Sequence, residues 1–135
     1  MTDCACGHQK PYNECCGLYI EGNIAAPNPE ALMRSRYSAY HFRNINYLAK
    51  TMKGEAAKDF DHAATEQWAE QLTWISLTVS SHKMKTLTQG FVIFEAKYSE
   101  KGQVRVMREK SEFHLIEGHW YYVAGKALNP HQGIS

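Results

Sequence analysis

After Cys16 the sequence contains no cysteine, although its first 16 residues contain four. Small secreted folds held by disulfides spread their cysteines along the chain, so this distribution argues against a disulfide framework. The sequence also lacks an apolar run of about 20 residues that could span a bilayer. Its beginning lacks the basic stretch and apolar run of a signal peptide. We therefore expect a cytoplasmic protein with no membrane association.

An excess of charge of either sign is absent as well. Lysine and arginine number 15 and aspartate and glutamate 14, which gives a formal net charge of +1. Such a chain has no overall field that would draw it onto nucleic acid, and its basic residues are not clustered around aromatic ones. No phosphate-binding glycine loop or activated serine is recognisable. These absences leave protein or small-molecule partners.

The four cysteines form two close pairs, Cys4 with Cys6 and Cys15 with Cys16, separated by a short loop. Four thiolates can surround zinc tetrahedrally at about 2.3 Å each, which closes the site to substrate and favours a structural role. The pairs are tighter than the usual spacing of two to four intervening residues. A redox interpretation therefore stays open, in which each close pair forms a disulfide.

Two residues of the loop between the pairs are candidates for supporting such a site. Four thiolates around one divalent ion leave a net charge of about −2, which needs donors or cations nearby. Lys10 is the local candidate, whereas His8 could instead replace a cysteine as ligand. Lys10 and Tyr12 could also contact a partner, or could be a solvated charge and a packing ring.

The spacing of these residues resembles the SEC-C motif, the zinc-binding element at the C-terminal tail of the SecA translocation ATPase. The motif is read here as Cys4-x-Cys6-Gly7-x-x-Lys10-x-Tyr12-x-x-Cys15-Cys16-Gly17. With the run from Ala31 to Tyr40 and the run from Trp120 to Val123, nearly the whole chain resembles the YchJ family. One departure is His8-Gln9, because the family loop usually reads Gly-Ser-Gly before the lysine.

The resemblance implies both a fold and a function. It implies Zn²⁺ bound by Cys4, Cys6, Cys15 and Cys16, in a knuckle of residues 1–24 followed by a nuclear transport factor 2-like or cystatin-like cone of residues 25–135. In SecA the element is associated with the SecB chaperone and the ribosome. We therefore expect a non-enzymatic adaptor that presents the knuckle to a protein partner. The alternative is a small-molecule binder or enzyme that uses a pocket in the cone.

The body of the chain independently predicts an α+β domain. Asn28, Pro29 and Glu30 form a helix start, and the helix should run to about Phe42. Further helices are expected over residues 46–51 and 63–72, with a linker through Gly54 and with Asp61 as a cap. In the first helix Met33, Tyr37 and Tyr40 should face the core, whereas Arg34 and Arg43 should face water.

The second half of the chain predicts antiparallel strands. Ile75, Leu77 and Val79 alternate with polar residues and should share a buried face. Strands over residues 91–98, 104–116 and 119–123 should follow, joined by turns at Gly102 and at Glu117-Gly118. Helices followed by such strands predict helices packed on one face of a curved antiparallel sheet.

A pocket between helix and sheet is expected to be lined by Arg36, Glu109 and Ser111. Period-two alternation places Glu109 and Ser111 on one side of the third strand, with Arg105, Met107 and Phe113. Arg36 could hold an anion, but we expect it to pair with Glu109 or Glu112 and so to hold the helix on the sheet. We predict no catalytic residue, although a strand carboxylate could act as a general base.

Overall fold

The computed structural model describes residues 3–128. The chain begins with a short 3-10 helix, Tyr12–Glu14, and continues with five α-helices and four strands. These are α1 (Cys16–Ile20), α2 (Pro29–Phe42), α3 (Ile45–Lys50), α4 (Gly54–Lys58), α5 (His62–Glu70), β1 (Leu72–Met84), β2 (Gln89–Glu100), β3 (Gln103–Ile116) and β4 (His119–Ala127). The predicted α+β class is therefore confirmed.

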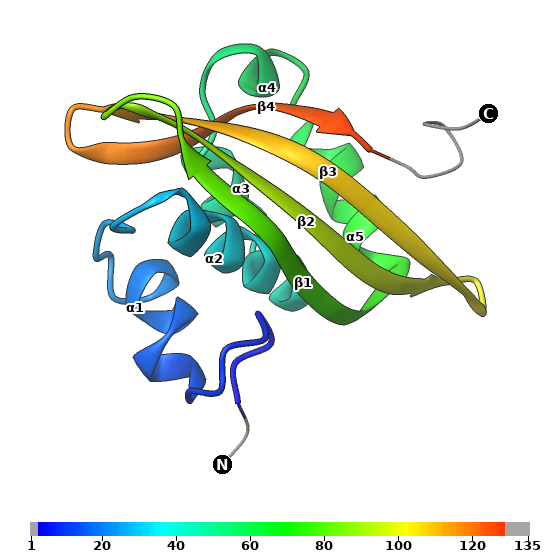
Figure 1. Cartoon of the computed structure of the whole chain (residues 1–135). Helices are drawn as coiled ribbons and strands as arrows, with labels where there is room; N and C mark the ends of the chain where they lie inside the picture. Colours follow the sequence, from blue (N-terminus) through cyan, green and yellow to red (C-terminus); the bar gives the residue numbers. More distant parts are fainter. Residues whose placement is uncertain (1–2, 129–135) are drawn as a thin grey trace.

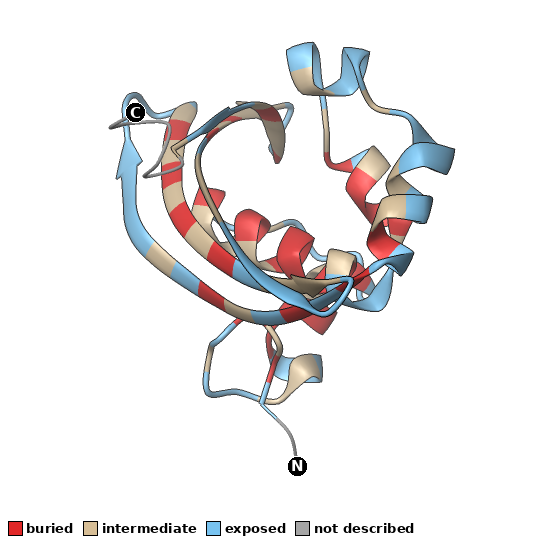
Figure 2. Cartoon of the chain, turned by 90° about the vertical axis from the view of Figure 1, so that its right-hand side faces the viewer, coloured by how far each residue is buried: buried red, intermediate tan, exposed pale blue. Residues whose placement is uncertain are grey.

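The strands form one antiparallel sheet in the order β1-β2-β3-β4, so each strand pairs with its neighbour in sequence. The sheet curves around α2, and the main helices lie on its concave side (Figures 1 and 2). Register shifts in β1 and between β3 and β4 mark bulges, which bend strands and increase their twist. This curvature gives the predicted cone, with its core between α2 and the inner face of the sheet.

The first long helix begins and ends as its sequence predicts. The Asn28 Oδ1 atom accepts a hydrogen bond from the Ala31 amide at 2.8 Å, and Pro29 is the first helical residue. Arg43 ends the helix in the left-handed region, with φ of 60°. Asn44 then caps α3 by accepting a hydrogen bond from the Tyr47 amide at 3.0 Å. These caps fix the angle between α2 and α3.

Two of three predictions for the following segment are wrong in detail. The expected linker at Gly54 is instead the start of α4. The helix expected over residues 63–72 ends at Glu70, because Leu72 already pairs with Glu100 in the sheet. Asp61 does cap α5, and its Oδ1 atom accepts from the Ala64 amide at 2.9 Å.

The predicted buried face of β1 is wrong at Ile75, which is 52% exposed. Trp74 pairs with Tyr98 and Ser76 pairs with Lys97, so Ile75 is the extra residue of a bulge. The bulge lets both Trp74 and Leu77 point into the core, which strict alternation would forbid. A period-two pattern in sequence could not show this switch.

The predicted boundary between a knuckle of residues 1–24 and a cone of residues 25–135 stays a prediction. Residues 1–2 of the first range and 129–135 of the second lie outside the described part of the chain. Within residues 3–128, no helix is long and apolar enough to cross a membrane.

Candidate metal centre

The fold brings the four cysteines together at the N-terminal end of the molecule. All four are buried and present free thiols, and their Sγ atoms lie within 4.8 Å of one another. The Sγ atoms of Cys6 and Cys15, one from each pair, are 3.6 Å apart. Four sulfurs at 2.3 Å from a central zinc would be about 3.8 Å apart. The cluster can therefore hold a metal ion with little rearrangement.

The thiols influence one another strongly because they are crowded and shielded from water. Hydrogen bonds with Cys16 and Cys6 hold the pKa of the Cys4 thiol well below its usual range. Burial raises the pKa of Cys15 to about 12, and the hydrogen bond with Cys4 raises that of Cys16 further. One thiolate thus opposes the formation of the next. A divalent cation would remove this conflict by stabilising all four thiolates together.

The backbone of the loop positions the sulfurs. The Cys4 amide donates to the Lys10 carbonyl at 2.7 Å, and the Gly7 amide donates to the Cys4 carbonyl at 3.2 Å. Gly7 has φ of +98°, and a Cβ atom there would also lie 3.3 Å from the Leu77 carbonyl oxygen of β1. Glycine is therefore required by conformation and favoured by the close approach of the sheet.

One stripe of α2 holds the knuckle against the domain. Arg34 donates from Nη1 to the Cys6 carbonyl at 2.6 Å, and Ser38 Oγ lies 3.6 Å from Cys4 Sγ. Phe42 packs edge-on against Tyr12, with ring centroids 5.1 Å apart. These three helix residues are four positions apart, so they lie on one face. The knuckle is thus docked on the domain in this structure.

The side chains that surround the four cysteines differ in part from those predicted from the sequence. Arg34 was expected to face water, but its side chain is only 14% exposed and also contacts Glu30 at 2.9 Å. Lys10 is exposed and touches the cluster through its backbone carbonyl. His8 Nδ1 lies 3.6 Å from Cys15 Sγ, beside the four sulfurs rather than among them. Arg34 and Ser38 are therefore side chains of α2 that contact the cysteine residues directly, and a supporting role of Lys10 stays a prediction.

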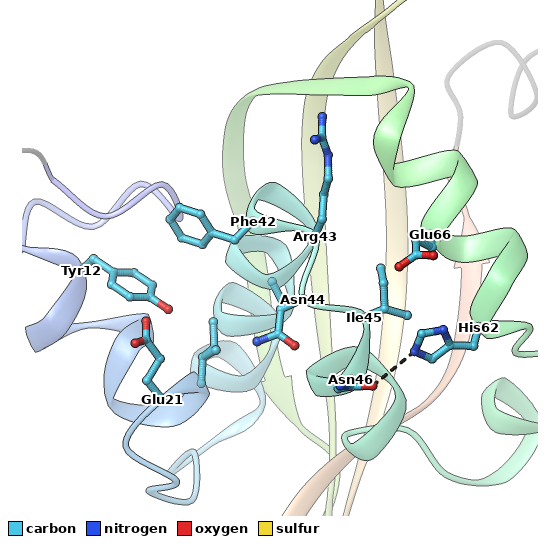
Figure 3. Close-up of a pocket in the computed structure, with 11 residues that line it drawn as sticks. Tyr12, Glu21, Phe42, Arg43, Asn44, Ile45, Asn46, His62 and Glu66 are labelled. Carbon is cyan, nitrogen blue, oxygen red and sulfur yellow. Dashed lines mark hydrogen bonds between the residues drawn. The ribbon is translucent and has the colours of Figure 1, made fainter.

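An open cavity of about 600 Å³ lies where the knuckle meets the domain (Figure 3). Tyr12 and Glu21 approach from the knuckle side, whereas Phe42 and Arg43 come from the end of α2. Phe42 is 53% exposed, and Arg43 is exposed beside it. The cavity therefore combines aromatic surface with a cationic side chain. Its other lining residues are Ile20, Ala39, Asn44, Ile45, Asn46, His62 and Glu66.

A second cavity, of about 230 Å³, lies inside the cone. Its lining includes Arg36, Glu109 and Ser111, the three residues predicted to share a pocket. The structure therefore brings these three residues together. Apolar and aromatic side chains form the rest of its wall. These are Met33, Tyr37, Tyr40, Trp68, Trp74, Phe94, Ala96, Met107, Phe113 and Tyr122.

The expected ion pair of Arg36 is wrong. Within the described residues, neither Glu109 nor Glu112 has a carboxylate oxygen within 4.0 Å of the Arg36 guanidinium. Arg36 donates from Nη1 to the Leu48 carbonyl at 2.8 Å and to Thr51 Oγ1 at 2.6 Å. It is 7% exposed, and this burial lowers the pKa of its guanidinium.

Tyr122 lies between Arg36 and Glu109, which we expected to form an ion pair. The Arg36 guanidinium lies 4.7 Å from the centroid of the Tyr122 ring. The Tyr122 hydroxyl donates to Glu109 Oε2 at 3.0 Å, and Ser111 donates to the same oxygen at 2.5 Å. Glu112 instead contacts His114 at 2.6 Å on the other face of β3. Sequence spacing alone could not find Tyr122, because a bulge between β3 and β4 sets its register.

Comparisons with known proteins agree with the fold and with the cysteine pattern. Residues 28–125 match the family model described as YchJ, middle NTF2-like domain. A UPF0225 protein of Geobacter sulfurreducens is 36% identical, over 100% of this chain and 86% of its own length.

Two solved structures are also similar over most of their length. A SEC-C motif containing protein from Rhodopseudomonas palustris is 33% identical and has a TM-score of 0.86, over 95% of this chain and all of that one. A SEC-C motif containing protein from Psychrobacter arcticus is 27% identical with a TM-score of 0.82, over 92% of this chain and 81% of that one.

Proposed function

The chain belongs to the YchJ family, with an N-terminal SEC-C motif and an NTF2-like domain, and from this premise we propose that it is a zinc-containing adaptor for a protein partner. Four free, buried thiols within 4.8 Å of one another are the observation that carries the proposal. Cys4, Cys6, Cys15 and Cys16 are the proposed zinc ligands.

The chemistry of the donor set supports zinc in particular. Thiolates are soft ligands, and a tetrahedron of four sulfurs is typical of structural zinc sites. Four protein ligands leave no position for substrate, so the ion stabilises the knuckle rather than acting in catalysis. Arg34, hydrogen-bonded to the Cys6 carbonyl, offsets part of the negative charge of the complex.

The cavity between knuckle and domain is the proposed docking surface. Its aromatic part, Tyr12 and Phe42, suits an apolar side chain of the partner. Arg43 lies at the same cavity and would attract a carboxylate close to it, whereas Glu21 and Glu66, which also line the cavity, would keep that carboxylate to the Arg43 side. We therefore propose that the partner presents a protein segment with an apolar residue next to an acidic one. Zinc binding would keep Tyr12 in place beside Phe42 and so keep this surface formed.

Metal content tests the first half of the proposal. Elemental analysis of protein purified without chelator should give about one zinc per chain. Four thiols should react with a thiol reagent only after the metal is removed. A metal-free protein with oxidised cysteine pairs would contradict the proposal and favour the redox alternative.

Photo-crosslinking tests the second half. A photoreactive phenylalanine analogue at position 42 should give one dominant adduct in cells, and Arg43→Glu or Cys16→Ser should abolish it. The same analogue at Leu87, which is 90% exposed on the distant turn between β1 and β2, is the matched control. Identical adducts from both positions, or an adduct unaffected by Arg43→Glu, would refute docking at this cavity.

A further inference from the structure

We propose that the cavity inside the cone binds a small molecule that has a carboxylate and an apolar or aromatic body. This inference concerns the domain alone and does not depend on the metal site. Its basis is two largely buried side chains that line the same cavity: Arg36, whose Nε and Nη2 have no protein acceptor among the described residues, and Trp74, whose indole N–H has no hydrogen-bond partner there.

The first donor is the guanidinium of Arg36. Both of its hydrogen bonds come from Nη1, so Nε and Nη2 have no protein acceptor in the described part of the chain; unlike Trp74 Nε1, these two nitrogens are not fully buried. Its acceptors are a carbonyl and a hydroxyl, so no anion balances its charge within 4.0 Å among residues 3–128. A buried charge without an ionic partner destabilises the fold. An anionic ligand would offset that cost.

The second donor is the indole N–H of Trp74. Among the described residues, its Nε1 is the one buried side-chain nitrogen or oxygen that has no hydrogen-bond partner. The indole nitrogen can only donate, and so can the guanidinium of Arg36. Both groups therefore need an acceptor, and a carboxylate supplies two oxygens together with the charge that Arg36 lacks.

Glu109 is the other charged group of the cavity, and one of its two carboxylate oxygens is engaged, whereas Oε1 has no hydrogen bond among the described residues. Its Oε2 atom accepts from the hydroxyls of Ser111 and Tyr122. The Tyr122 ring stacks on Arg36 and keeps the guanidinium from pairing with this carboxylate. Among the described residues, two donors at the cavity, the Arg36 guanidinium and the Trp74 indole N–H, thus lack an acceptor, against one free carboxylate oxygen, Glu109 Oε1. Glu109 should therefore weaken the binding of an anion by repulsion without preventing it.

The wall and the size of the cavity define the rest of the ligand. Trp68, Phe94 and Phe113 contribute flat apolar surface that suits an aromatic or branched aliphatic body. At about 30 Å³ of liquid volume per water, a cavity of about 230 Å³ has room for roughly eight waters. The ligand is therefore small, with on the order of ten non-hydrogen atoms.

An outer cavity adjoins the inner one beside α4. This outer cavity of about 340 Å³ shares Arg36, Tyr40 and Tyr122 with the inner one. It extends to Glu55 and Asp59, which are exposed and so screened by salt. Arg36 thus lies between the two cavities.

Binding of phenylacetate, which has ten non-hydrogen atoms and is anionic at pH 7, tests the proposal. The readout is the set of three indole N–H signals in two-dimensional ¹H–¹⁵N NMR spectra, with the Trp74 signal assigned by its loss in Trp74→Phe. We expect saturable movement of that signal at millimolar phenylacetate, and at least tenfold weaker effects of phenylacetamide and phenethylammonium. These analogues replace the carboxylate by a neutral and by a cationic group.

Four variants separate binding at this site from other causes. Trp74→Phe, followed through the Trp68 signal, and Arg36→Met should each weaken phenylacetate binding roughly tenfold or more, whereas the matched Trp120→Phe, outside the cavity wall, should change it less than about threefold. Glu109→Gln should strengthen binding, because it removes a like charge. Thermal unfolding checks that each variant is folded. If Arg36→Met does not fold, the opposite effects expected for Trp74→Phe and Glu109→Gln still decide the matter.

Several results would overturn the proposal. The Trp74 signal of the wild-type protein could stay still up to 10 mM phenylacetate (on the order of the weakest specific binding). Binding could also be equal in Trp74→Phe and wild type. Finally, phenethylammonium could bind in preference and be lost in Glu109→Gln, which would make the cavity a cation site.

Discussion

Replacing Arg34 by methionine should loosen the knuckle from the domain without disturbing α2. Methionine keeps the length of the side chain and is a good helix former. The change removes the 2.6 Å hydrogen bond to the Cys6 carbonyl and the 2.9 Å contact with Glu30. A hydrogen bond from a charged group contributes about 1.5–3 kcal/mol, and an exposed i,i+4 pair about 0.3–0.5 kcal/mol. We take about 2 kcal/mol as the expected loss.

Amide hydrogen exchange gives this loss a local readout. The Cys4 and Gly7 amides are hydrogen-bonded within the knuckle and should exchange when it opens. Since 1.4 kcal/mol corresponds to a factor of ten, Arg34→Met should speed their exchange by roughly 30-fold. Amides of β2 and β3, which belong to the central sheet, should exchange at the wild-type rate.

Arg105→Met is the matched control. It removes an arginine whose side chain is 53% exposed and which pairs with Glu100 at 3.3 Å on the far end of the sheet. This variant should leave the exchange of Cys4 and Gly7 unchanged. If Arg34→Met speeds that exchange by less than threefold, or no more than Arg105→Met does, the assignment of Arg34 as the clamp of the knuckle is refuted.

Three further predictions follow from packing and burial. Gly125→Ala should lower the free energy of unfolding by about 1–3 kcal/mol, measured by urea denaturation, because its Cβ would overlap the hydroxyl of Tyr122. Gly7→Ala should lower it by about 1 kcal/mol or more, because alanine tolerates a φ of +98° poorly and would press on Leu77. Burial raises the pKa of Tyr37 to about 12 from 10.0. Since the folded state holds this phenolic proton more tightly, stability should fall as pH rises from about 10 to 12, and less steeply in Tyr37→Phe, in urea midpoints measured across that range.

Each of these predictions has an outcome that contradicts it. Equal urea midpoints for Gly125→Ala and for a change of the neighbouring exposed Lys126 to alanine would show that the strand yields without cost. A Gly7→Ala protein as stable as wild type would mean that the turn can adopt another conformation. For Tyr37, identical alkaline stability profiles with and without the hydroxyl would show that its proton does not contribute.

Local features of the fold could be predicted because they depend on neighbouring residues. Asn28 and Pro29 set the start of α2, and Asp61 sets that of α5, since a capping side chain acts within three residues. The shared face of Glu109 and Ser111 follows from strand alternation alone. The clustering of the cysteines followed from their spacing and from the family resemblance.

Features that depend on distant contacts could not be predicted. Ile75 turned outward because a bulge in β1 interrupts the alternation, and nothing in its immediate neighbours marks that bulge. Arg36 lost its expected carboxylate because the ring of Tyr122, 86 positions later in sequence (122 minus 36), lies against it. Arg34 was assigned to water because helical periodicity describes the domain core and not a separate knuckle.

The double use of α2 restricts where the length of this chain can change during evolution. One face of the helix contacts the knuckle through Arg34 and Ser38, and another lines the inner cavity through Arg36 and Tyr40. Inserting one residue between Arg36 and Ser38 would rotate the rest of the helix by about 100°. Ser38 would then leave the face that contacts the knuckle, and Tyr40 would leave the face that lines the inner cavity. Insertions should instead be tolerated at turns such as Gly102, where nothing lies within 4 Å of an added Cβ. Homologous chains are therefore expected to keep the length of α2 constant while their sheet turns grow or shrink.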